Sequence, residues 1–145
     1  MAEYKNVEKP FLEKLKELDW KVIDQGSFGI PQDPAKSLRT TFKEVTLKEE
    51  FLSAVKKINT VEGKEWLTDK QLEDLYVEII ATEKSNLSLQ EANKTVFEKL
   101  IGKTKTTVAE NEITGEQSPL VKLIDFDDWS ANSFVAINQF RIVTP

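Results

Sequence analysis

The fold is decided by the stretch Leu120-Val-Lys-Leu-Ile-Asp-Phe126, Asp127-Asp-Trp-Ser-Ala-Asn132 and Ser133-Phe-Val-Ala-Ile-Asn-Gln-Phe-Arg-Ile-Val143. Its first and third segments are rich in β-branched and aromatic residues, and the middle segment is polar and typical of a turn. This pattern predicts an antiparallel hairpin. Because a two-stranded hairpin is marginally stable alone, a further strand is expected after Pro145, in which case the chain is the front portion of a larger protein.

The rest of the chain is mostly helical in pattern. Apolar residues recur at helical spacing in four segments, at residues 7–18, 47–58, 72–80 and 89–101. Three capping boxes mark helix starts, namely Thr46 with Glu49, Thr68 with Gln71, and Ser88 with Glu91. Gly102 stands where a helix C-terminus favours glycine.

Strand-forming residues fill the remaining segments. Trp20–Ile23 is a short strand candidate, Thr104–Glu110 is another, and residues 114–116 form a predicted turn. The predicted order is therefore a helix, a strand, three helices and a C-terminal antiparallel β-meander. We expect an α+β fold and a single domain over residues 1–145.

Composition limits the possible chemistry. The chain contains no cysteine and no histidine, which excludes disulfides, thiolate metal sites and catalytic triads built on either residue. A metal site would have to use Asp and Glu oxygens, which favour Mg²⁺ or Mn²⁺ over Zn²⁺. The net charge of −5 argues against a surface that coats nucleic acid nonspecifically.

Hydropathy predicts a soluble, cytoplasmic protein with no membrane partner. No window of the sequence approaches the apolar length of a membrane span. The N-terminal Met1-Ala-Glu-Tyr-Lys5 lacks the apolar segment of a signal peptide.

Six short strings, in this order and spacing, resemble the N-terminal region of the R (restriction, HsdR) subunit of type I restriction–modification enzymes. The similarity extends from about Glu8 to Phe140. The strings are Leu38-Arg-Thr-Thr-Phe-Lys-Glu-Val-Thr-Leu47, Ala54-Val-Lys-Lys-Ile-Asn59, Leu87-Ser-Leu-Gln-Glu-Ala-Asn93, Val96-Phe-Glu-Lys-Leu-Ile-Gly102, Val121-Lys-Leu-Ile-Asp-Phe126 and Asn132-Ser-Phe-Val-Ala-Ile-Asn-Gln-Phe140.

The resemblance implies the incomplete front part of a PD-(D/E)xK nuclease core, fused in the parent protein to an ATP-driven DNA translocase. In that family an Asp on one strand and a Glu-x-Lys on the next hold the metal. Neither appears before Pro145, so we expect this chain alone to bind no cofactor and to cleave no DNA. The parent protein would use Mg²⁺ and ATP, cut DNA after translocation, and assemble with the methylation and specificity subunits.

The same resemblance makes Glu8 a candidate accessory acid that faces the metal. The alternative for Glu8 is a solvated glutamate that stabilises the start of a helix. The basic residues Lys14, Lys16, Arg39 and Lys43 are candidate contacts to DNA phosphates. Each of them also has an acidic neighbour nearby, so a mixed charged surface is the alternative.

Three polar residues of this stretch are expected to be structural, namely Asp125, Asn132 and Gln139. Asp125 has apolar neighbours, where a carboxylate needs partners, and the turn that ends at Asn132 offers backbone donors. A metal-binding role for Asp125 is the alternative. Asn138 and Gln139 alternate along the last strand, where one amide would hydrogen-bond across the hairpin or to the missing strand and the other would face solvent.

Two rival functions remain open. One is a stand-alone binding module with no enzymatic activity, which pairs with a partner or with itself through the exposed edge of Ser133–Val143. The other is a domain of a related nuclease or of a methyltransferase–nuclease fusion, which the six strings do not separate from the type I case.

Overall fold

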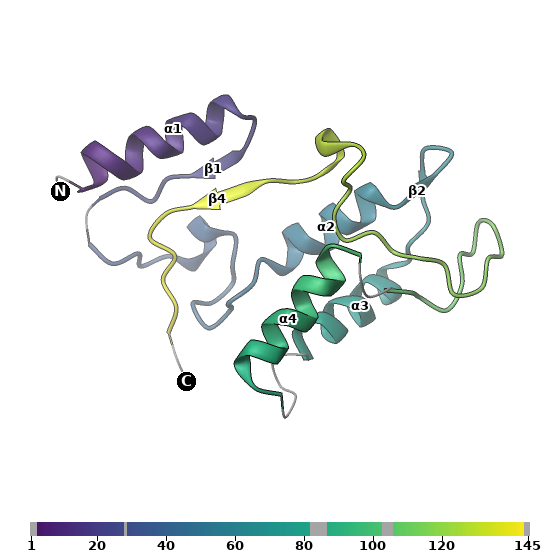
Figure 1. The fold of residues 1–145 in the computed structure, drawn as a ribbon. Coiled ribbons are helices and arrows are strands. Elements are labelled where there is room, and N and C mark those ends of the chain that lie inside the picture. Colours follow the sequence, from purple (N-terminus) through teal and green to yellow (C-terminus); the bar gives the residue numbers. More distant parts are fainter. Residues whose placement is uncertain (1–2, 28, 82–86, 103–105, 144–145) are drawn as a thin grey trace. The chain divides into compact units, whose positions relative to one another are not determined.

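The computed structural model describes residues 3–27, 29–81, 87–102 and 106–143 (Figure 1). The chain divides into two compact units. Unit 1 comprises Met1–Glu50 and Ser133–Pro145, and unit 2 comprises Phe51–Asn132. The expected single domain over residues 1–145 stays a prediction. None of the described helices has the length and apolar character needed to cross a membrane.

Unit 1 is built on a pair of parallel strands. The chain enters through a π-helical turn (Tyr4–Glu8) and α1 (Lys9–Glu17), with Pro10 in the first turn, where a missing N–H is tolerated. Next come β1 (Lys21–Ile23) and a 3₁₀ turn (Pro34–Ser37). The last strand, β4 (Val135–Ile137), lies beside β1 in Figure 1.

The parallel pair joins residues more than 110 positions apart in the sequence. Lys21 pairs with Val135, Val22 with Ala136, and Ile23 with Ile137. The Lys21 amide donates to the Phe134 carbonyl at 2.9 Å, and the rings of Trp20 and Phe134 stack with centroids 5.1 Å apart. Backbone pairing and aromatic packing therefore fix the register together.

Unit 2 contains the apolar core. Its elements are α2 (Lys48–Ile58, which begins in unit 1), a hairpin of β2 (Thr60–Val61) and β3 (Lys64–Glu65), α3 (Asp69–Ala81), α4 (Leu89–Leu100) and a 3₁₀ turn (Trp129–Ala131). The hairpin turns at Gly63, whose φ of 76° suits glycine. The buried cluster consists of Val55, Trp66, Leu67, Leu72, Leu75 and Val121.

Two predicted capping boxes are confirmed. The Thr68 hydroxyl accepts from the Gln71 amide, and the Gln71 side chain accepts from the Thr68 amide. Ser88 and Glu91 make the same reciprocal pair at the start of α4. Gly102 follows the last turn of α4 with φ of 71°, the left-handed conformation predicted for this position.

The mixture of helices and small sheets agrees with the predicted α+β class. The predicted C-terminal β-meander, however, is wrong. Residues 120–126 form no strand, and antiparallel pairing there is limited to isolated bridges of Thr107 with Leu120 and Glu110 with Gln117. The other half of the predicted hairpin contains β4, which pairs in parallel with β1 instead. Thr104, where a strand was predicted to begin, lies outside the described residues.

Side chains explain why residues 120–126 do not form a strand. The Lys122 amide donates to Asn59 Oδ1 at 2.9 Å, and its carbonyl accepts from Asn59 Nδ2 at 2.8 Å. Asn132 bonds both the amide and the carbonyl of Asp125 in the same way. Backbone groups that would form a ladder are thus already used. Likeness to a PD-(D/E)xK core and self-association through the last strand stay predictions.

Candidate functional site at the ends of β1 and β4

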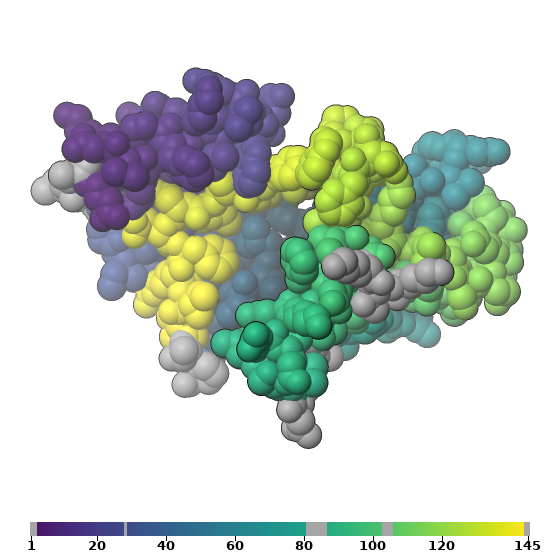
Figure 2. Space-filling model, viewed as in Figure 1, coloured from purple at the N-terminus to yellow at the C-terminus, as the bar shows by residue number. Residues whose placement is uncertain are grey.

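Polar side chains gather where β1 and β4 end. Asp24 directly follows β1, and Asn138 and Gln139 directly follow β4. Because parallel strands end at the same edge of a sheet, these side chains meet there. Glu8, at the start of α1, joins them, and we call these four residues the Glu8 cluster. Figure 2 shows the yellow C-terminal segment packed beside the purple α1.

Glu8 is held by two side-chain amides. Asn138 Nδ2 donates to Glu8 Oε2 at 3.3 Å. Gln139 Nε2 lies 3.3 Å from Glu8 Oε1 and 3.4 Å from Oε2. These neutral donors orient the Glu8 carboxylate. Because Glu8 is only half-buried, the carboxylate also remains open to a further ligand.

Asp24 is the second carboxylate of the cluster. Its Oδ2 accepts from the Tyr4 hydroxyl at 2.5 Å, and its Oδ1 accepts from the Gly26 amide at 2.8 Å. The Tyr4 hydrogen bond is the largest cause that lowers the pKa of Asp24, with further contributions from the Gly26 amide and the Asn138 side chain. Asp24 is therefore ionised over the whole neutral pH range.

Asn138 connects the two carboxylates. Its Nδ2 lies 3.3 Å from Glu8 Oε2 and 3.2 Å from Asp24 Oδ1, so one amide group bridges two negative charges. Its Oδ1 accepts from the Gln25 amide at 2.7 Å. Gln25 Nε2 in turn donates to the carbonyls of Asn138 and Gln139 at 2.8 and 3.1 Å. The bonds from Gln25 fix the backbone that carries both amides.

Carboxylate oxygens are the ligands that Mg²⁺ prefers in proteins. Glu8 and Asp24 provide two carboxylates on either side of the Asn138 amide, so the donor chemistry of this edge fits such an ion. Within the ranges that the structure describes, no group of three or more Asp, Glu, His or Cys side chains is arranged to hold a metal.

The four predicted DNA-contacting residues have different environments. Lys14, Lys16 and Lys43 are exposed, and Lys14 pairs with Glu17 at 2.6 Å. Arg39 is only 3% exposed. The expectation of a surface role for Arg39 is therefore corrected, because its guanidinium lies inside unit 1. DNA binding by the three lysines stays a prediction.

Asp125 and Asn132 belong to unit 2 and are engaged within it. Asp125 Oδ1 accepts from the amides of Asp127 and Asp128, both at 2.9 Å, and Oδ2 accepts from Lys122 Nζ at 3.1 Å. These bonds, led by the Asp128 amide, lower the pKa of Asp125. This is the structural role that the sequence favours for Asp125, in the turn that Asn132 closes.

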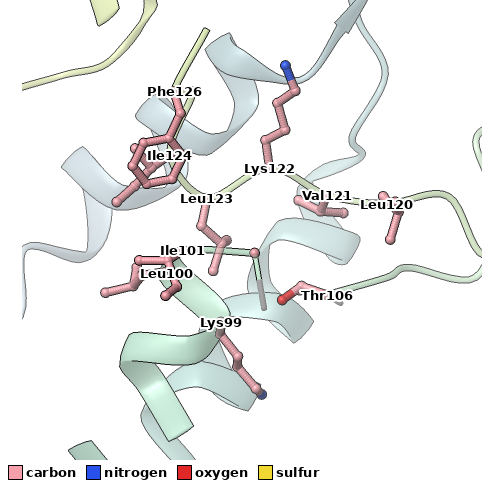
Figure 3. Close-up of a pocket in the computed structure, with 11 residues that line it drawn as sticks. Lys99, Leu100, Ile101, Thr106, Leu120, Val121, Lys122, Leu123, Ile124 and Phe126 are labelled. Carbon is pink, nitrogen blue, oxygen red and sulfur yellow. The ribbon is translucent and has the colours of Figure 1, made fainter. Parts of the chain in front are cut away.

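Unit 2 also has an apolar cavity of about 210 Å³ between the end of α4 and residues 120–126 (Figure 3). Leu100, Ile101, Leu123 and Ile124 line it, and Lys122 points away from them in the figure. The lining is mainly aliphatic, and it also includes Lys99 and Thr106. Lys99 Nζ pairs with Glu78 at 2.5 Å.

Sequence reasoning missed Asp24 and underrated Asn138. No motif singled out Asp24, and Asn138 was predicted only as one of two alternating strand amides. The usable signal was that Asp24 follows a short strand directly, as Asn138 follows a later one. That signal has meaning only if the two strands run in parallel and side by side.

Comparison with known proteins gives a consistent result. The family described as "Type I restriction enzyme R protein N terminus" matches residues 1–144. A putative type I restriction enzyme MjaIXP endonuclease subunit of Methanocaldococcus jannaschii is 28% identical over 94% of the chain. The type I restriction enzyme HindI endonuclease subunit of Haemophilus influenzae is 27% identical over 98% of the chain. The chain spans 12% of the length of each of these relatives. No solved structure matches.

Proposed function

Because this chain belongs to the family of the type I restriction enzyme R protein N terminus, we propose that it is the front part of the endonuclease region of such an R subunit. The intact protein would hydrolyse DNA phosphodiester bonds with Mg²⁺ after ATP-driven translocation. It would do so in an assembly with the methylation and specificity subunits. The observation that carries the proposal is a pair of carboxylates. Asp24 follows β1, and Glu8 is held by the two amides that follow β4.

The carboxylates have a definite part in this proposal. A bound Mg²⁺ stabilises developing charge and lowers the pKa of the attacking water. Glu8 and Asp24 would supply oxygen ligands, and Tyr4 would keep Asp24 ionised through its hydrogen bond. Asn138 and Gln139 would hold Glu8 in place. Donors that hydrogen-bond to a metal ligand in this way commonly affect metal affinity or activity by about 10–100-fold.

We expect the chain by itself not to cleave DNA. A phosphodiesterase site needs clustered carboxylates and a cation near the reacting phosphate. The Glu8 cluster has two carboxylates, and the described part of the chain adds no third to form a metal-holding group. The remaining Asp and the Glu-x-Lys pair would come from another part of the parent protein.

The test uses the intact R subunit, assembled with its partner subunits, and the variant Glu8→Gln. Glu13→Gln is the matched control, because Glu13 lies in α1, the helix that begins directly after Glu8 along the chain, with its side chain 60% exposed. We expect Glu8→Gln to lower Mg²⁺-dependent DNA cleavage by about 10-fold or more. ATP hydrolysis and translocation should be unchanged in both variants. Full cleavage by Glu8→Gln would remove Glu8 from the site, and absence of cleavage by the wild-type assembly would refute the proposed function.

A further inference from the structure

Aromatic rings and guanidinium groups alternate in a stack beside the Glu8 cluster. The order is Phe140, Arg39, Phe42 and Arg141. The Arg39 guanidinium carbon lies 3.7 Å from the centroid of the Phe140 ring and 5.6 Å from that of the Phe42 ring. The Arg141 guanidinium carbon lies 4.7 Å from the Phe42 ring centroid. The stack joins the loop after the 3₁₀ turn of unit 1 to the segment that follows β4.

Arg39 is the buried member of this stack. It is 3% exposed, its Nε donates to Ser37 Oγ at 3.0 Å, and its Nη1 donates to the Glu44 carbonyl at 2.8 Å. Ser37, which is itself fully buried, donates to the Pro34 carbonyl. Burial lowers the pKa of Arg39, and the Glu44 carboxylate opposes this change. Two ring faces, the Ser37 hydroxyl and the Glu44 carbonyl thus stabilise a cation that would otherwise be costly to bury.

The position of Phe140 connects Arg39 to the Glu8 cluster. Phe140 directly follows Gln139, which has a φ of 52°. A residue other than glycine rarely adopts this left-handed conformation without support from its surroundings. The Gln139 carbonyl is held by Gln25 on one side, and the next residue along the chain is held by the Arg39 guanidinium.

We propose that Arg39 is a positioning residue for the Glu8 cluster. By stacking on Phe140 while its Nε and Nη1 are bonded to Ser37 and Glu44, it holds Gln139 in the left-handed conformation that directs the Gln139 amide to Glu8. Arg39 therefore acts on Glu8 through Phe140 and Gln139. The contacts by which Arg39 holds Gln139 all lie within unit 1. Only the importance of Arg39 for catalysis rests on the proposed function.

The chemistry of arginine makes a sharp test possible. Lysine keeps the positive charge but cannot reproduce the planar fork that bonds Ser37 and Glu44 together. Arg39→Lys and Arg39→Met should therefore both release Phe140. Nuclear magnetic resonance spectra of the 145-residue chain measure this release. In both variants the backbone chemical shifts of Gln139 should lose the values typical of a positive φ, which we call the Gln139 signature. The side-chain amide signals of Gln139 should move at the same time.

Controls separate positioning from general loss of stability. Leu15→Ala removes a buried side chain of α1 in the same unit and should lower stability while the Gln139 signature persists. Phe140→Leu keeps apolar bulk but removes the ring face, so it should reproduce the effect of Arg39→Lys even if Arg39→Met fails to fold. An unchanged Gln139 signature in Arg39→Lys and Phe140→Leu would overturn the proposal.

Cleavage by the intact assembly then distinguishes the two proposals. If Arg39→Lys changes the Gln139 signature and lowers DNA cleavage by about 10-fold, the positioning role and its catalytic importance both stand. If the signature changes and cleavage does not, Arg39 still positions Gln139, and the proposed role of the Glu8 cluster in cleavage fails.

Discussion

Different kinds of interaction stabilise the inside of each of the two units. Unit 2 has a cluster of buried apolar side chains, contributed mainly by α2, α3 and the turn between them. In unit 1 the buried apolar residues are Leu12 and Leu15, and the buried polar residues are Ser37 and Arg39. Its distant segments are joined by hydrogen bonds such as that from the Gln25 amide to Asn138, across 113 positions.

This difference separates a region that stabilises itself from a region that positions chemical groups. A buried leucine contributes about 1.5–3 kcal/mol through its apolar surface, whereas a typical hydrogen bond contributes about 0.5–1.5 kcal/mol. Hydrogen bonds, however, fix direction, which apolar contacts do not. The polar residues that join unit 1 are therefore the same ones that orient Glu8 and Asp24.

The largest expected effect is in the apolar core of unit 2. Leu75 is 2% exposed in α3, and Leu75→Ala should lower the free energy of unfolding by about 2–5 kcal/mol because it leaves a cavity. Val77, on the same helix but 60% exposed, is the matched control, and Val77→Ala should change it by about 0.5 kcal/mol or less. Urea denaturation measures both. Equal losses would show that the cluster around Leu75 is not the stabilising core.

A smaller effect is expected from Asn138→Asp in unit 1. The change removes the amide that bridges Glu8 and Asp24 and adds a third negative charge beside them. We expect a loss of about 1–3 kcal/mol in the free energy of unfolding. Millimolar Mg²⁺ should restore part of this loss, because an ion bound only by the folded state stabilises it.

The control for the effect of Mg²⁺ on Asn138→Asp is potassium chloride at the same ionic strength. Screening alone would act equally in both salts. Thermal unfolding in the two salts therefore isolates binding from screening. Equal stabilisation by both salts would mean that the carboxylates are too far apart or too mobile to share an ion.

The smallest expected effect concerns the hydrogen bond from Tyr4 to Asp24. Tyr4→Phe should raise the pKa of Asp24 towards its ordinary value, because this bond is the largest cause of its lowered pKa. Carboxyl carbon shifts of Asp24 in a pH titration measure the change. Tyr76→Phe, in unit 2, is the control, since Tyr76 packs against Phe51.

The effect of Tyr4→Phe on stability should depend on pH in a definite way. The lowered pKa of Asp24 contributes stability above its unfolded pKa, and this contribution is lost as the pH falls through the folded pKa. The bond to Asp24 also raises the pKa of Tyr4, and this contribution is lost as the pH rises past the ordinary tyrosine value. The difference between variant and wild type should therefore be largest near neutral pH. A difference that persisted at acid pH would contradict this assignment.

Local features of this protein were predictable from sequence because their causes lie within a few residues. Apolar spacing located the helices, and the capping boxes at Thr68 and Ser88 placed the starts of α3 and α4. Trp20–Ile23 was also predicted as a strand, and β1 occupies Lys21–Ile23. Glu8 was singled out by resemblance, and the structure places it with Asp24, Asn138 and Gln139.

The sequence alone thus determined the helices, the caps of α3 and α4, the α+β class and the family. Only the tertiary structure decided that β4 pairs with β1 and that Asn59 and Asn132 occupy the backbone groups of residues 120–126. It also decided that Arg39 is buried. The physical reason is distance along the chain. A strand-forming segment fixes a preference for extended backbone, but which donors and acceptors satisfy that backbone depends on residues that can lie 113 positions away.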